Sequence, residues 1–236
     1  MERLLREGLQ EMGFQPSALQ IDQFIHFYRL LEEWNKKMNL TNIISPEEVV
    51  THHFLDSASC ASTPCFNKCD RILDLGTGAG FPGIPLKILY PEKSFTLMDS
   101  LAKRINFLKV VSETLGLEKL DLVHARAEEA AREGGYREVF DGVVSRAVAS
   151  LPVLLEYTVP FIKKGGWLIC QKGPKWQEEL KEAEQAMKLL SVSLEEVVAV
   201  NIPKADLSHH VMVFRKDQRT SKKYPRKAGT PGKKPL

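Results

Sequence analysis

The sequence lacks the features that would place it in a membrane or outside the cell. No apolar run approaches the roughly 20 residues that a helix needs to cross a bilayer. The opening stretch, MERLLREGLQEMG, is charged and amphipathic, unlike a secretory signal. The four cysteines, Cys60, Cys65, Cys69 and Cys170, show no disulfide framework. We therefore expect a cytoplasmic protein with no membrane partner.

Metal-binding patterns are also scarce. The cysteine spacings lack the C-x₂-C pair that is common in structural zinc sites. His52 and His53 fall on a predicted helix whose apolar side holds Val49 and Phe54, so packing explains them better than metal ligation does. We expect no bound metal.

The charge is small but unevenly distributed. The chain has 236 residues, 43% of them hydrophobic, which fits one sizeable domain, alone or with an appendage. The net charge is +3, yet the segment from Arg215 onward contributes nine basic residues and one acid, so this segment carries +8 and the remainder −5. A basic end rich in Pro and Gly favours nucleic-acid binding. The alternative is a solvated segment that aids solubility.

The first 66 residues have the periodicity of helices. Ser17 and Gln20 form a capping-box pattern ahead of apolar residues at helical spacing. Ser45-Pro46-Glu47-Glu48 is a second start signal, with a cap, a proline at the first helical position and a following acid. We predict an N-terminal helical cap over residues 1–66.

From residue 67 short apolar runs alternate with helix-length segments. This alternation predicts right-handed βαβ units and therefore an α/β, Rossmann-like sheet, mostly parallel and seven-stranded. The last two strands have only a short link that contains a proline, so they should pair antiparallel as a C-terminal hairpin. We predict this domain over 67–216 and a basic, flexible tail over 217–236. The predicted strands are RILDL, SFTLMD, LDLVHA, DGVVS, GWLICQK, EEVVAVNI and HHVMVFR.

A glycine-rich turn follows the first predicted strand, where open parallel sheets bind ligands. Its GAGFPG formally matches G-x-G-x-x-G, which is typical of dinucleotide sites. However, Asp74 lies in the strand just before it, and a carboxylate there would oppose a pyrophosphate. Glycines at 76, 78 and 80 bend the backbone around a ligand edge rather than presenting a helix N-terminus. The turn therefore favours a cationic ligand without phosphates.

Three further strand ends carry suitable side chains. Asp99 closes the second strand, where an acid accepts hydrogen bonds from ribose hydroxyls. Ala127 and Glu128 follow the third strand, where an adenine edge would lie, and Arg146 follows the fourth. Together these residues fit S-adenosylmethionine, a sulfonium nucleoside.

Several motifs in order carry a family resemblance. LDLGTGAGFPG, FTLMDSLAKRINFL, ARAEE and FDGVVSRAVASL resemble class I methyltransferases. More narrowly, with WNKKMNLTNI, HHFLDS and KKYPRKAGTP, they resemble GidB, the bacterial small-subunit ribosomal RNA methyltransferase G family. The resemblance implies methyl transfer from S-adenosylmethionine to N7 of one guanine in 16S rRNA, with the rRNA or the 30S particle as partner. We expect a monomer.

The resemblance also implies roles for individual residues. It places Gly76, Phe81, Ala127, Glu128 and Arg146 at the cofactor, beside Gly78 of the turn and Asp99. Asn39 and His53 recur in the family motifs and are candidates for RNA contact, although a helix-end cap and a core contact explain them nearly as well. His209-His210 stands where the family often has an arginine. The tail candidates for RNA contact are Lys222, Lys223, Arg226 and Lys227.

The implied chemistry needs no general base. Guanine N7 has a lone pair that faces the major groove, so positioning should supply most of the rate. After the fourth strand there is neither an Asn/Asp-Pro-Pro-aromatic loop nor a cysteine nucleophile. Our hypothesis is that Arg146 orients the base or its phosphate; the alternative is a surface arginine that pairs with Glu128 or Asp99.

Two other functions fit the sequence less well. The G-x-G-x-x-G match would suit an NAD(P)-dependent oxidoreductase, and the basic tail would suit a non-catalytic RNA-binding protein. If the tail binds RNA, its deletion after Arg215 should weaken RNA association and spare cofactor binding.

Overall fold

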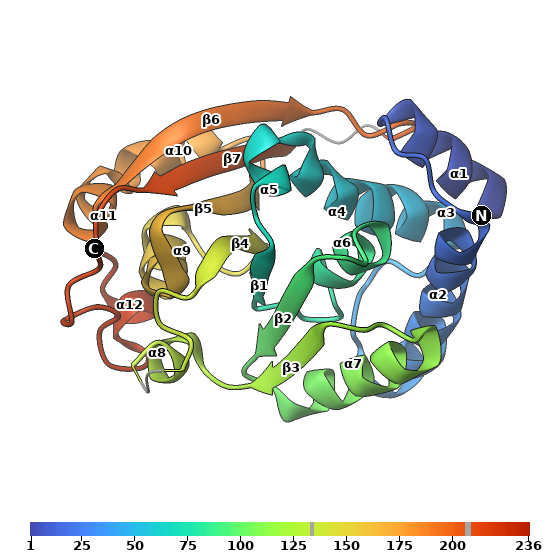
Figure 1. The fold of residues 1–236 in the computed structure, drawn as a ribbon, viewed down its shortest axis with the longest axis horizontal. Helices are drawn as coiled ribbons and strands as arrows, with labels where there is room; N and C mark the ends of the chain where they lie inside the picture. Colours follow the sequence, from blue (N-terminus) through green and yellow to red (C-terminus); the bar gives the residue numbers. More distant parts are fainter. Residues whose placement is uncertain (133–134, 206–208) are drawn as a thin grey trace.

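A seven-stranded sheet runs through the computed structural model, which describes residues 1–132, 135–205 and 209–236. The strand order is β3-β2-β1-β4-β5-β7-β6, and β7 runs antiparallel to both of its neighbours (Figure 1). This confirms the predicted mostly parallel sheet with an antiparallel C-terminal pair. The strands are β1 (Arg71–Leu75), β2 (Ser94–Asp99), β3 (Leu120–His124), β4 (Phe140–Arg146), β5 (Ile162–Lys172), β6 (Val192–Val200) and β7 (His209–Lys216).

Helices cover both faces of the sheet (Figure 1). One face carries α1 (Glu2–Glu11), α2 (Ala18–Met38), α3 (Pro46–Val49), the π-helix η1 (Val50–Leu55), α4 (Asp56–Ala58), the 3₁₀ helix η2 (Ser59–Ser62), α5 (Pro64–Asn67), α6 (Gly83–Leu89) and α7 (Ala102–Leu115). The other carries α8 (Ala127–Ala130), α9 (Leu151–Thr158), the 3₁₀ helix η3 (Val159–Phe161), α10 (Trp176–Glu182), α11 (Glu184–Leu190) and α12 (Thr230–Lys233). Within the described residues, no helix combines the length and hydrophobicity needed to cross a bilayer.

The N-terminal helices share one hydrophobic core with α6 and α7. The predicted capping box at Ser17 and Gln20 opens α2 with both of its hydrogen bonds present. Phe27 of α2 is fully buried and stacks on Phe54, with ring centroids 5.7 Å apart, and on Phe107 of α7 at 6.5 Å. These contacts hold η1, and the histidines it carries, against α2.

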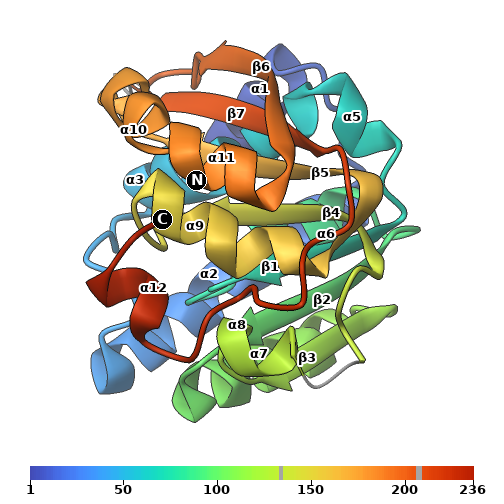
Figure 2. The same cartoon turned by 90° about the vertical axis from the view of Figure 1, so that its left-hand side faces the viewer.

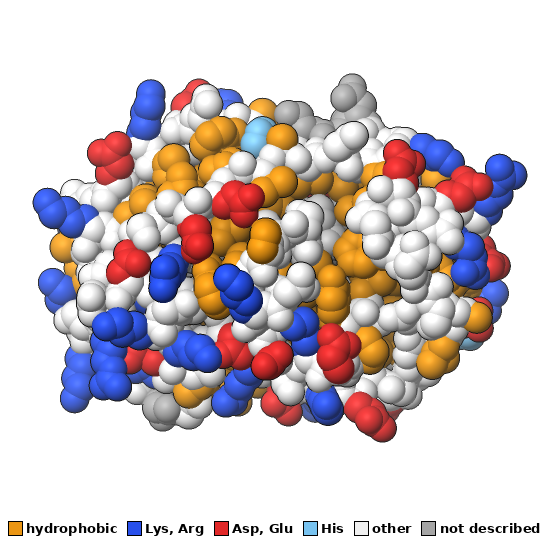
Figure 3. Space-filling view, turned by 45° about the horizontal axis from the view of Figure 1, so that its top comes forward, with side chains coloured by type: hydrophobic (Ala, Val, Ile, Leu, Met, Phe, Trp, Pro, Cys, Tyr) orange, Lys and Arg blue, Asp and Glu red, His pale blue; other side chains and the backbone are white. Residues whose placement is uncertain are grey.

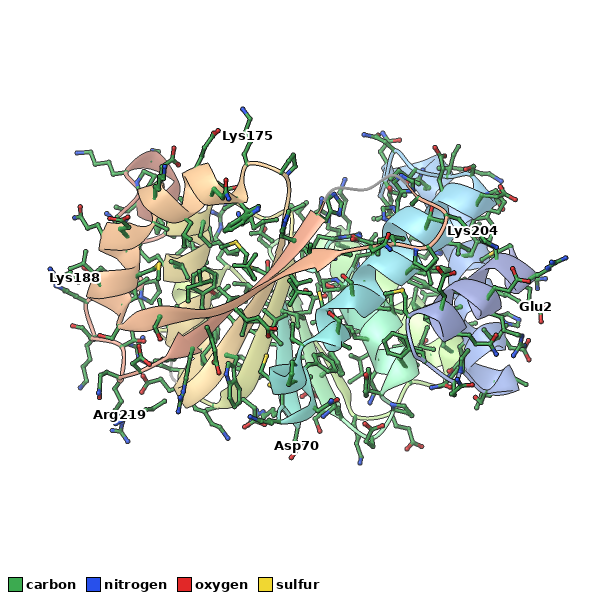
Figure 4. The ribbon with its side chains drawn as sticks, turned by 90° about the horizontal axis from the view of Figure 1, so that it is seen from above. Glu2, Asp70, Lys175, Lys188, Lys204 and Arg219 are labelled. Atoms are coloured by element: carbon green, nitrogen blue, oxygen red, sulfur yellow. The ribbon has the colours of Figure 1, made fainter. Side chains whose placement is uncertain are left out.

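Residues 217–236, here called the C-terminal segment, pack on the α9 face rather than forming the expected flexible tail. Figure 4 shows Asp70 and Arg219 on the side of the sheet where the parallel strands begin, and Lys175 on the side where they end. From Arg219 the segment runs past α8 to α12 (Figure 2). The Arg226 guanidinium pairs with Glu156, which is completely buried. A buried carboxylate requires a partner, and the basic composition of the segment supplies it.

Candidate functional site

The glycine turn after β1 is held by its own hydrogen bonds to the protein. The amides of Gly76 and Thr77 donate to the Met98 carbonyl, at 2.9 and 3.2 Å. The Gly78 amide donates to Oδ2 of Asp99 at 3.0 Å. Gly76 and Gly78 have φ values of +72° and +61°, a region that favours glycine. The turn thus ties the end of β1 to the end of β2.

Further amides of the turn also donate hydrogen bonds within the protein. The amides of Gly80 and Phe81 both donate to the Thr77 carbonyl at 2.9 Å. The Asp74 carboxylate accepts from the Thr77 hydroxyl at 2.6 Å and from the Gly83 amide at 2.8 Å. Burial raises the pKa of Asp74 to about 7. Asp74 therefore caps the turn, and these amides are not available to cradle a phosphate.

A first cavity of about 310 Å³ opens beside this turn, at the carboxyl ends of β1, β2 and β3. Four of the predicted cofactor residues, Gly76, Asp99, Ala127 and Glu128, lie on its wall. The Asp99 side chain is fixed by hydrogen bonds from the Leu101 amide and from Arg104. The other lining residues are Leu75, Met98, Ser100, Arg104, Ala125, Arg126, Ala147, Val148, Tyr157 and Gly229.

The C-terminal segment supplies part of this wall. Gly229 lines the first cavity, and its amide donates to Oε1 of the buried Glu128 at 2.9 Å. Tyr157 of α9 lines the cavity beside it. The segment that was expected to form a flexible tail therefore contacts a predicted cofactor residue, because the buried Glu128 accepts a hydrogen bond from it.

A second cavity of about 670 Å³ adjoins the first. Both cavities are lined by Ala147 and Val148, which directly follow β4. Ala147 has a φ of +54°, a conformation that is uncommon outside glycine and that concentrates at functional sites. The other lining residues are Ile43, His52, His53, Asp56, Arg146, Ala149, Gln171, Lys172, Gly173, Glu179 and His209.

Arg146 lies in the second cavity with its guanidinium fixed from several sides. Nη1 donates to the His52 carbonyl at 3.0 Å and to Oδ2 of Asp56 at 2.8 Å. Nη2 lies 3.2 Å from Nδ1 of His53, and the guanidinium carbon lies 5.0 Å from the centre of the Phe81 ring. The two hydrogen bonds from Nη1 use two of the five N–H groups of a guanidinium. Arg146 is thus held rigidly at the cavity wall.

Two residues assigned to the cofactor through the family resemblance lie elsewhere. Arg146 lines the second cavity and not the first, and Phe81 is buried beneath Arg146 without lining either. The partner of Arg146 is Asp56, not the Glu128 or Asp99 that the alternative interpretation suggested. No local sequence pattern indicates this pair, because its members are 90 positions apart.

Asp56 is the centre of the polar network in the second cavity. Its carboxylate, 1% exposed, accepts hydrogen bonds from Arg146, from Nε2 of Gln171 at 2.9 Å and from Nδ1 of His209 at 3.1 Å. Burial alone would raise the pKa of Asp56, but the His209 hydrogen bond and the Arg146 charge outweigh it and lower that pKa. The same hydrogen bond raises the pKa of His209.

His53 and Asn39 have different surroundings. The His53 ring stacks on Phe81 at 4.4 Å, and its Nε2 lies 2.9 Å from Oγ1 of Thr41. Burial, and then the Arg146 charge, lowers the pKa of His53 to about 4, so the ring is neutral at pH 7. Asn39 is the exposed C-cap of α2, with a φ of +47°, and it lines neither cavity.

The tail candidates for RNA contact fall into two groups. Lys222, Lys223 and Lys227 are exposed, whereas Arg226 is bound to Glu156. Lys and Arg side chains gather on the left of the space-filling view, the side on which Figure 1 places α11 and the C-terminal segment (Figure 3). Arg226 is therefore the one of the four candidates whose charge is paired with a buried carboxylate.

Several residues of the second cavity were not predicted. Gln171 and Lys172 end β5, and the rule that ligands bind at the carboxyl ends of strands could have found them. Lys172 also pairs with Glu179 of α10 at 2.7 Å. Asp56 stands in HHFLDS next to apolar residues, which signals a buried carboxylate. In the part of the chain that the structure describes, no group of His, Cys, Asp and Glu side chains could hold a metal ion.

The sheet order, with its reversed β7, and the cavities at the strand ends define a class I methyltransferase fold. A Klebsiella pneumoniae protein described as an O-methyltransferase is similar, with a TM-score of 0.58 at 13% identity over 92% of this chain and 96% of that one. A chain of the Haloferax volcanii complex between the Trm112 activator and a methyltransferase gives a TM-score of 0.56 at 16% identity, over 80% and 98%.

The sequence comparisons narrow the class to a family. The family model for rRNA small subunit methyltransferase G matches residues 20–210. The proteins named Ribosomal RNA small subunit methyltransferase G from Alkaliphilus metalliredigens and Desulfitobacterium hafniense are each 48% identical to this chain. The alignments cover 99% and 100% of this chain and 98% and 97% of those proteins. The chain belongs to the rRNA small subunit methyltransferase G family.

Proposed function

We propose that this chain transfers a methyl group from S-adenosylmethionine to N7 of a guanine in 16S rRNA. The first cavity holds the cofactor and the second receives the base. The observation that supports this most directly is that the two cavities meet at Ala147 and Val148, so that two ligands can react across a shared wall. The relatives named above are, by name, ribosomal RNA small subunit methyltransferases.

The first cavity suits this cofactor better than a dinucleotide. The amides of the turn glycines Gly76, Gly78 and Gly80 are engaged within the protein, which disfavours the usual cradle for a pyrophosphate. Asp99 offers carboxylate oxygens to ribose hydroxyls, and Ala127 and Glu128 offer a wall for adenine. When bound, the cofactor supplies an electrophilic methyl group on a positively charged sulfur.

The residues of the second cavity position the base rather than activate it. Guanine N7 attacks with its own lone pair, so no proton has to be removed. Arg146 is fixed by Asp56, His52 and Phe81, and its remaining N–H groups can orient the base or its phosphate. Arg146 is thus the proposed positioning residue, with Lys172 on the same cavity wall.

Methyl transfer from labelled S-adenosylmethionine to 16S rRNA or 30S particles from cells that lack this protein tests the proposal. Borohydride and aniline treatment cleaves RNA at N7-methylguanine and maps the product. Label at another atom would refute the N7 assignment, and no incorporation would leave a non-catalytic RNA-binding protein. Stabilisation by NAD but not by S-adenosylhomocysteine, measured by thermal shift, would favour an oxidoreductase.

Arg146→Gln tests the positioning role. Because a small misplacement of reactants can cost on the order of 100-fold in rate, we expect methyl transfer to fall by about that factor. S-adenosylhomocysteine affinity should change little, since Arg146 does not line the first cavity. Arg3→Gln, which removes the same charge from an exposed position on α1, is the matched control. Full activity of Arg146→Gln would exclude the role.

A further inference from the structure

The C-terminal segment contributes to the wall of the first cavity, and it also carries lysines that are exposed to solvent. Gly229 forms part of the cavity wall and donates to Glu128. Gly229 has a φ of +78°, so the backbone conformation that brings it there favours glycine. Lys222, Lys223 and Lys227 of the same segment are exposed. Without the segment the first cavity would lack the part of its wall that Gly229 supplies.

A buried ion pair holds the segment in place. Glu156 is completely buried on α9, and the hydrogen bonds described for its carboxylate all come from Arg226. The Arg226 amide donates to Oε1 at 2.7 Å, and its guanidinium donates to both oxygens, with Nη2 to Oε2 at 2.6 Å. Undocking would leave this carboxylate without its counter-charge. Tyr157, the next residue of α9, lines the first cavity.

Two arginines of the body bind the backbone of the segment. Arg137 donates to the carbonyls of Thr220 and Tyr224, both at 2.9 Å. Arg132 donates twice to the Pro225 carbonyl, at 2.9 and 2.7 Å. These contacts fix the path by which the chain travels from β7 to Gly229.

We propose that the C-terminal segment is a structural part of the cofactor site, so that its docking and cofactor binding stabilise each other. This inference rests on the proposed function for the identity of the cofactor. A ligand that binds only the docked form must increase the docked population, and undocking must weaken the ligand by the same factor. The segment is therefore required for cofactor affinity, contrary to the expectation that its deletion would spare it.

Limited trypsin digestion of the unaltered chain tests the coupling without any substitution. Cleavage after Lys222, Lys223 and Lys227 is followed by mass spectrometry, with and without S-adenosylhomocysteine. At ten times its Kd the ligand should slow this cleavage about tenfold, because cleavage follows the undocked population. Unchanged cleavage at saturating ligand would overturn the inference while leaving the proposed function intact. No binding of S-adenosylhomocysteine by calorimetry would overturn the cofactor assignment and this inference together.

A matched pair of variants tests the role of the ion pair. Glu156→Gln removes the counter-charge of Arg226, and Glu129→Gln makes the same change at an exposed position of α8. We expect Glu156→Gln to speed cleavage of the segment and to raise the Kd of S-adenosylhomocysteine about tenfold. For Glu129→Gln, the cleavage rate and the Kd should both stay within about twofold of the values for the unaltered chain. Either of two results overturns the inference: cleavage of Glu156→Gln at the control rate, or a fully cleavable segment with unchanged Kd.

Discussion

The Asp56–Arg146 pair gives the sharpest prediction for stability. Asp56→Asn keeps the shape of the side chain but removes its charge. In each hydrogen bond described for it, the Asp56 carboxylate is the acceptor, and the donors are on Arg146, Gln171 and His209. An asparagine amide would place its NH₂ group against one of these donors. We expect the variant to lose both an ion pair and a hydrogen bond.

The size of the loss follows from the geometry. At 2.8 Å and an effective dielectric constant of about 20, the Coulomb energy is about 6 kcal/mol, part of which offsets the cost of burying the charges. Breaking a buried pair by removing one partner costs about 3–5 kcal/mol. We therefore expect Asp56→Asn to lower the free energy of unfolding by about 3 kcal/mol, and Arg146→Met to have a similar effect.

Urea denaturation at pH 7 of both single variants and of the double variant measures this coupling. Because each single variant leaves one charge unpaired, the double variant should lose less than the sum of the two by about 2 kcal/mol. If the double variant loses as much free energy of unfolding as the two single variants together, within about 0.5 kcal/mol, the two residues are not energetically coupled. A loss below about 1 kcal/mol for Asp56→Asn would refute the stated burial cost.

Two further predictions concern protonation and RNA. Because the pKa of His53 is lowered to about 4, the unfolded chain binds a proton between pH 6.5 and pH 4 that the folded chain does not. The free energy of unfolding should therefore fall by about 3 kcal/mol as the pH is lowered from 6.5 to 4. Urea titrations of His53→Gln should show a smaller fall over the same pH range. The same pH dependence in the variant and the unaltered chain would contradict the lowered pKa of His53. For RNA, replacing Lys222 and Lys223 by alanine should reduce the slope of log K against log salt by about 1–2, and an unchanged slope would mean that neither lysine meets a phosphate.

The sequence predicts the sheet well because its strands are short apolar runs between breakers. RILDL and SFTLMD match β1 and β2 residue for residue, and the antiparallel pairing of β6 and β7 follows from their short link. The predicted ends of a strand are less accurate where pairing with a neighbouring strand decides its length. β5 begins at Ile162, four residues before the predicted strand, because Phe140 of β4 offers a partner there. The π-helix over Val50–Leu55 likewise has no local signal.

The residues of the site also include some that the local sequence predicts and others that depend on distant contacts. Gly76, Asp99, Ala127 and Glu128 were predictable because each follows or ends a strand, where local sequence fixes the position. The place of Arg146 depends on Asp56, from a distant helix, and no periodicity reveals such a contact.

The C-terminal segment was mispredicted for a related reason. Its lysines, prolines and glycines are typical of disorder. What orders the segment is a pair of buried acids, Glu128 and Glu156, on other helices. Glu156 stands alone in the apolar run LPVLLEYTV, and that isolated charge is the available hint of a partner elsewhere.

The position of Gly229 has a consequence for biosynthesis. Translation proceeds from the N-terminus, and every other residue lining the first cavity precedes Gly229 in the chain. The glycine turn, the sheet and α9 can therefore assemble on the translating ribosome while the cavity still lacks its last wall. A nascent chain that stops after β7 would have nearly all of the fold and an incomplete binding site.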